Sequence, residues 1–94
     1  MQTYAGVTAS QLWDVARRHG VIRMRVFGSW ARGDARPESD LDLLVGLEPD
    51  RTLWDLSRLK DDLDSLVGVR VDLVTEGGLS RYIRDRVIAE SIPL

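Results

Sequence analysis

Apolar residues recur along this 94-residue chain with two periods, one typical of helices and one typical of strands. Residues 9–19 carry apolar side chains at helical spacing, and residues 51–67 carry a leucine every three or four positions, so we predict a helix over each. A third helix is expected over residues 80–90, with Ile83 and Val87 facing inward.

Three stretches between these helices show the period of two that is typical of strands. Residues 21–27 alternate between an apolar face and a face that carries two arginines, and further strands are predicted over residues 40–45 and 69–74. The apolar face of the first strand consists of Ile22, Met24 and Val26. Between the first and second strands, residues 29–32 are long enough for one helical turn, and a proline-containing loop follows.

The second and third strands are joined by a crossover helix, which favours a parallel pair with that helix over one face. Side chains alternate along a strand, so the apolar residues of both strands then point under the helix. The acids Asp40, Asp42 and Asp72 project from the opposite face. We therefore predict a single α/β (α+β) domain over residues 1–94, with a short mixed sheet of three to four strands flanked by helices.

Composition and charge narrow the class of protein. The chain has no cysteine, which excludes disulfides and thiolate metal sites, and no apolar run approaches the roughly 18 residues of a membrane helix. The N-terminal residues do not resemble a secretory signal, so we expect a soluble cytoplasmic protein. The net charge is −2, but residues 17–36 hold six arginines against Asp34 alone, whereas residues 38–64 hold nine acids against three bases. A site that binds phosphates and a cation would need a basic segment beside an acidic one, although solvated helix faces give the same charge pattern.

The three acids on one face indicate a cation site. Asp40 and Asp42 stand two residues apart on a strand, about 7 Å along it, and Asp72 from the adjacent strand can complete a triangle. Such carboxylates repel one another unless they are protonated or bind a cation. A site with oxygen ligands and no His or Cys selects a hard ion such as magnesium, which commonly accompanies phosphates.

Gly28 and Ser29 come directly after the first strand and fit a phosphate site. Glycine allows the backbone to approach a phosphate closely, and the hydroxyl of Ser29 adds a donor. Taken alone, the pair is also compatible with an ordinary strand-to-helix turn capped by serine. Together with the acids, it favours a nucleotide site.

The "GS" of residues 28–29, followed after ten residues by the "DLD" of residues 40–42, resembles the signature of the polymerase-beta-like nucleotidyltransferases. The whole run "GSWARGDARPESDLDLLV" resembles the minimal nucleotidyltransferases (MNT) of that superfamily, and the order of elements agrees over nearly the whole chain. The resemblance implies a polymerase-beta-like palm that binds magnesium and a nucleoside triphosphate. The implied metal-binding and catalytic acids are Asp40, Asp42 and Asp72, and the implied triphosphate-binding residues are Gly28 and Ser29.

The resemblance also implies a reaction and a partner. A hydroxyl would attack the α-phosphate of ATP and release pyrophosphate, with Asp72 best placed to help deprotonate the acceptor. Small members of the family act as antitoxins paired with a helical HEPN-type ribonuclease toxin, whose tyrosine hydroxyl they adenylylate. For this chain we therefore expect that toxin as both binding partner and substrate, with a homo- or hetero-oligomer possible.

Several assignments have plain alternatives. Arg32 is a candidate for steadying the phosphates but can equally pair with Asp34, and Ser39 either orients Asp40 or is a simple loop residue. The chain as a whole could instead inhibit its toxin by binding alone, or transfer nucleotides to RNA or a small molecule. No basic acceptor groove is evident, so direct binding of nucleic acid is not expected.

Overall fold

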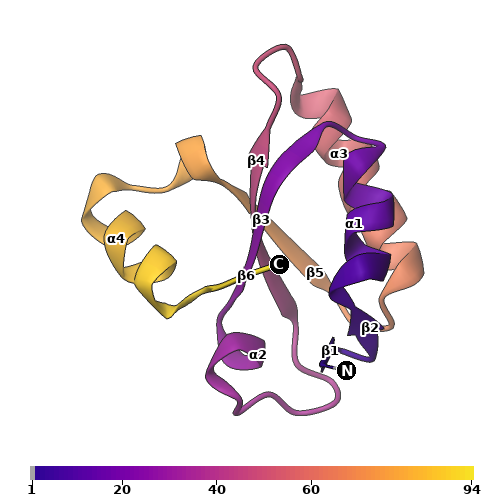
Figure 1. Ribbon diagram of the computed structural model, residues 1–94, viewed down its shortest axis with the longest axis vertical. Coiled ribbons are helices and arrows are strands. Elements are labelled where there is room, and N and C mark those ends of the chain that lie inside the picture. The colour runs from indigo at the N-terminus through magenta and orange to yellow at the C-terminus, as the bar shows by residue number, and fades with distance from the viewer. Residues whose placement is uncertain (1) are drawn as a thin grey trace.

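The computed structural model describes residues 2–94 and arranges them in a four-stranded sheet, a short hairpin and four α-helices (Figure 1). The strands of the sheet are β3 (Val21–Phe27), β4 (Leu41–Leu47), β5 (Val71–Thr75) and β6 (Ile92–Pro93), and those of the hairpin are β1 (Thr3–Tyr4) and β2 (Val7–Thr8). The helices are α1 (Ala9–Arg17), α2 (Ser29–Arg32), α3 (Leu53–Leu66) and α4 (Arg81–Glu90), with a 3₁₀ turn η1 (Glu76–Gly78) after β5.

The sheet is mixed, as expected, and its strand order is β5-β4-β3-β6. The β4 and β5 strands run parallel, whereas β3 is antiparallel to both of its neighbours. Helices α1 and α3 lie together on one side of the sheet, and α4 lies on the other side (Figure 1). Within residues 2–94, no helix is long and apolar enough to cross a bilayer.

Local sequence signals fix where helices α1 and α3 begin. Thr8 and Gln11 form a capping box at the start of α1, with the Gln11 N–H donating to Thr8 Oγ1 at 3.2 Å. Thr52 and Asp55 form a second capping box, so α3 begins at Leu53 rather than at residue 51. The boundaries of both helices are therefore set by side chains that satisfy the first free N–H groups.

The core lies between the sheet and the pair α1 and α3. Its largest fully buried side chains come from both helices and from the three long strands: Leu12, Val26, Leu41, Leu43, Val45, Leu59, Leu63 and Val71. In the register of the parallel pair, Asp42 lies beside Asp72 and the neighbouring leucines lie beneath α3. This alternation agrees with the faces expected for β4 and β5.

Two predictions about apolar residues were wrong. A register shift between Val21 and Arg23 turns Ile22 outward, where it is 47% exposed, and Val21 is buried instead. Ile83 is also 47% exposed, because only the second half of α4, around Val87, is partly covered. Trp54 on α3 is 77% exposed and therefore lies outside the core.

Candidate active site

The turn after β3 brings backbone directly against a carboxylate of the next strand. Gly28 has φ +71°, and a Cβ atom at this position would lie 2.1 Å from Asp42 Oδ2. Its carbonyl oxygen accepts hydrogen bonds from the N–H groups of Ala31 and Arg32, which close the first turn of α2. Glycine is therefore needed here for its backbone conformation and for its lack of a side chain.

Asp42 and Asp72 form a close pair of carboxylates at the centre of this face. They are directly opposed in the β4·β5 register, and both are partly buried. Burial raises the pKa of Asp42 to about 6, with further contributions from the charge of Asp72, a hydrogen bond with Asp72 and the charge of Asp40. The nearby charge of Arg32 opposes this rise. The environment therefore disfavours the ionised form of Asp42.

Asp40 and Arg70 complete the charged surroundings of this pair. Asp40 is exposed, immediately before β4. Arg70 Nε lies 3.1 Å from Asp72 Oδ1 and forms an ion pair with it. Arg70 was not among the residues predicted from the sequence, although its spacing of two residues from Asp72 signals that both lie on the same side of the strand.

The donor set fits a hard cation by its chemistry. All three candidate side chains offer only oxygen. The raised pKa of Asp42 reflects burial first and then the nearby charges of Asp72 and Asp40, and a bound cation would offset both effects. Residues 2–94 contain no group of three or more His, Cys, Asp or Glu already arranged to hold a metal ion. The structure thus brings Asp42 and Asp72 together and leaves Asp40 exposed at the edge of the pair.

The loop between α2 and β4 is held by its own hydrogen bonds. Ser39 Oγ accepts from the Arg36 N–H at 2.8 Å, and the Trp30 indole N–H donates to the Ser39 carbonyl at 3.2 Å. Arg32 Nε donates to Asp34 Oδ2 at 3.3 Å, and both side chains are largely exposed. In this arrangement Ser39 braces the loop, and Trp30 packs the loop and α2 against the core.

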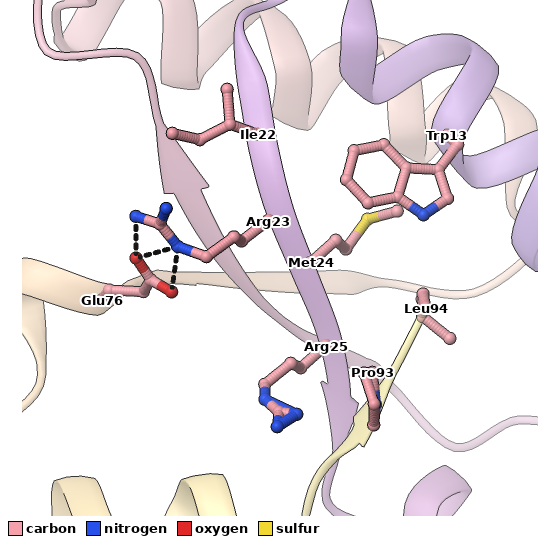
Figure 2. Close-up of a pocket in the computed structure, with 8 residues that line it drawn as sticks. All are labelled: Trp13, Ile22, Arg23, Met24, Arg25, Glu76, Pro93 and Leu94. Carbon is pink, nitrogen blue, oxygen red and sulfur yellow. Dashed lines mark hydrogen bonds and ion pairs between the residues drawn. The ribbon is translucent and has the colours of Figure 1, made fainter.

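Two cavities among the described residues lie away from the Gly28 turn, and the second of them is lined by one of the candidate acids, Asp72. The first, of about 350 Å³, follows β3 between α1 and the last residues of the chain (Figure 2). In it Arg23 donates hydrogen bonds to Glu76 at 2.8–3.0 Å, and Arg25 Nη1 is buried without a hydrogen-bond partner among the described residues. None of the sequence-predicted site residues lines it. The second, of about 340 Å³, lies between α3 and β5 and includes Asp72.

Comparisons with known proteins identify related sequences and similar folds. The family model described as a nucleotidyltransferase domain matches residues 9–94. The protein adenylyltransferase MntA of Thermococcus cleftensis is 38% identical over 79 residues, which cover 84% of this chain and 80% of that protein. A solved structure assigned to the minimal nucleotidyltransferases is 54% identical and superposes with a TM-score of 0.82, covering 90% of this chain and 87% of that one.

A more distant neighbour shares the fold. The crystal structure of a toxin-antitoxin with AMP-PNP superposes with a TM-score of 0.75 at 21% identity, covering 87% of this chain and 68% of that one. At this identity the likeness concerns the fold alone.

Proposed function

Because this chain belongs to the nucleotidyltransferase domain family, we propose that it transfers AMP from ATP to a hydroxyl of a partner protein. The relative from Thermococcus cleftensis, named a protein adenylyltransferase, supports a protein as the acceptor. The toxin-antitoxin neighbour supports a toxin as that protein, and its AMP-PNP supports ATP as the donor. In this proposal the partner is a HEPN-type ribonuclease, the acceptor is a tyrosine hydroxyl, and the chain acts as the antitoxin.

The observation that carries the proposal is the contact between the Gly28 turn and Asp42. It places a backbone segment without a side chain directly beside a carboxylate whose ionised form is disfavoured in the folded chain. Asp40, Asp42 and Asp72 would hold magnesium, which would supply charge neutralisation at the phosphates. Gly28 and Ser29 would bind the triphosphate, with Arg32 as an additional cation at its edge.

The reaction follows from these placements. The acceptor oxygen forms a bond to the α-phosphorus, the bond from that phosphorus to the bridging oxygen of the β-phosphate breaks, and pyrophosphate leaves. Asp72, which is partly exposed, accepts the proton of the acceptor hydroxyl. Arg70 keeps the Asp72 carboxylate in position through its ion pair.

The test is the intact mass of the cognate HEPN-type protein after incubation with this chain, ATP and magnesium. We expect a gain of one or more AMP masses, and no gain with the Asp42→Asn variant. If the two proteins bind and toxicity is suppressed without any gain in mass, the chain inhibits by binding alone and the proposed transfer is wrong.

A further inference from the structure

The β5 strand leaves part of its backbone directed away from the sheet. It lies at the edge of the strand order and pairs with β4 alone. The Leu41 N–H donates to the Arg70 carbonyl at 2.9 Å, so the backbone groups of Arg70 point toward β4. Because the backbone groups of successive residues point to alternate sides of a strand, those of Asp72 also point toward β4. Those of Val71 and Leu73 point to the outer edge. The Val71 N–H is already bonded to Asp64 Oδ1 at 3.2 Å. The N–H and C=O of Leu73 therefore face the open edge as a pair.

An apolar groove runs beside this edge. The groove has a volume of about 340 Å³ and is lined by Leu53, Leu56, Ser57 and Lys60 of α3 and by Asp72 and Leu73 of β5. Leu53, which lines the groove, is 81% exposed, and the next residue of α3, Trp54, is 77% exposed. An exposed apolar side chain beside both a groove and an open strand edge favours contact with another molecule.

Asp72 and Leu73 both line the groove, although their side chains leave β5 on opposite faces. The Leu73 side chain packs toward the core and the groove, whereas Asp72 projects beside Asp42 on the other face. A strand paired with the Leu73 backbone would alternate in the same way. One of its side chains would enter the groove, and the next along the chain would lie beside Asp72.

We propose that the acceptor protein adds an extended segment to the open edge of β5, with an apolar side chain in the groove and the acceptor hydroxyl on the adjacent residue. This inference rests on the proposed function and specifies how its substrate is recognised. The apolar lining of Leu53, Leu56 and Leu73 selects an apolar side chain. The neighbouring hydroxyl then reaches the carboxylate that accepts its proton.

The cavity along β3 is a poorer place for this segment. Its lining includes the Arg23 and Glu76 ion pair together with Arg25, and it contains none of the proposed acids (Figure 2). A segment bound there would have no acid from the Asp42 and Asp72 pair beside its hydroxyl. The β5 edge is the one that joins an open backbone pair, an apolar groove and Asp72.

The test compares two matched surface variants, Leu53→Glu at the groove and Tyr82→Glu on α4, where the side chain is 91% exposed. Both place one charge on an exposed apolar site. For AMP transfer to the HEPN-type protein, we expect Leu53→Glu to lower kcat/KM about tenfold or more, chiefly through KM. The affinity for magnesium-ATP should stay unchanged. Tyr82→Glu should match the wild type in both measurements.

A second readout does not depend on catalysis. Hydrogen exchange of the Leu73 amide should slow when the HEPN-type protein binds, in the presence of magnesium and AMP-PNP. Transfer at the wild-type rate by Leu53→Glu, or an unprotected Leu73 amide in the complex, would overturn the inference. So would a homodimer that Leu53→Glu dissociates, because a second copy would then occupy the edge. If the wild-type chain binds the partner at this edge but transfers no AMP, the proposed function fails while the docking site stands.

Discussion

Replacing Asp42 by asparagine should make the protein more stable at neutral pH. The folded state raises the pKa of this carboxyl from its ordinary value of 3.8 to about 6, mainly through burial and through Asp72. The folded chain therefore binds a proton more tightly than the unfolded chain. Between these two pKa values the free energy of unfolding falls as the pH rises. Above about pH 6 the folded state bears the full cost of ionising Asp42.

The size of the expected gain in stability follows from this change in the pKa of Asp42. A pKa change from 3.8 to about 6 corresponds to about 3 kcal/mol at most. Asp42 is partly exposed, so screening by water reduces the cost to about 1–2 kcal/mol. Asparagine has nearly the same shape and carries no charge, so Asp42→Asn should gain this amount at pH 7 and little at pH 4.

The assay is urea unfolding of both proteins from pH 4 to pH 7 in a buffer that contains a metal chelator. Asp50→Asn serves as the matched control, because Asp50 is exposed in the turn between β4 and α3. This control should leave the difference between pH 4 and pH 7 unchanged. The reasoning is refuted if Asp42→Asn is no more stable than the wild type at pH 7, or if its advantage is the same at pH 4.

Three further predictions follow from the structure. Gly28→Ala should abolish ATP binding and should lower the free energy of unfolding more than Gly33→Ala. Both glycines have positive φ, but only a Cβ at position 28 would meet Asp42. Equal losses of stability in urea unfolding would contradict this prediction. Magnesium should raise the unfolding midpoint more at pH 7 than at pH 5, since protons compete with the ion for the carboxylates of Asp40, Asp42 and Asp72. A rise that does not depend on pH would exclude these carboxylates as magnesium ligands. In urea unfolding, Leu63→Ala should lower the free energy of unfolding by about 2–5 kcal/mol, because Leu63 is fully buried. Leu53→Ala, at an exposed site, should lower it by less than about 0.5 kcal/mol. Comparable losses would mean that the burial of these side chains is misassigned.

Sequence patterns could predict the parts of this fold that repeat a signal over many residues. The period of two in β4 and β5 was enough to place Asp42 and Asp72 on the face opposite Leu41, Leu43 and Leu73. The capping box at Thr8 likewise marked the start of α1, because its geometry depends only on neighbouring residues. These features are local or strictly periodic.

Other features depend on distant contacts that leave little local trace. The strands β1, β2 and β6 have two residues each, which is too few to show a period, and they were not predicted. The bulge that turns Ile22 outward depends on how β3 meets β4, and the exposure of Ile83 depends on how α4 meets the sheet. The ion pair between Arg70 and Asp72 was missed because an exposed arginine has many acceptable surroundings.

The order of the strands has a consequence for how the protein is made. The two central strands, β3 and β4, are complete once residue 47 has been synthesised, but the carboxylate that lies beside Asp42 comes from residue 72. The second neighbour of β3 comes later still, from residues 92–93. A nascent chain on the ribosome would therefore hold the Gly28 turn for some time without its full set of acids, and the strand edges of its sheet would be open to other chains during that interval.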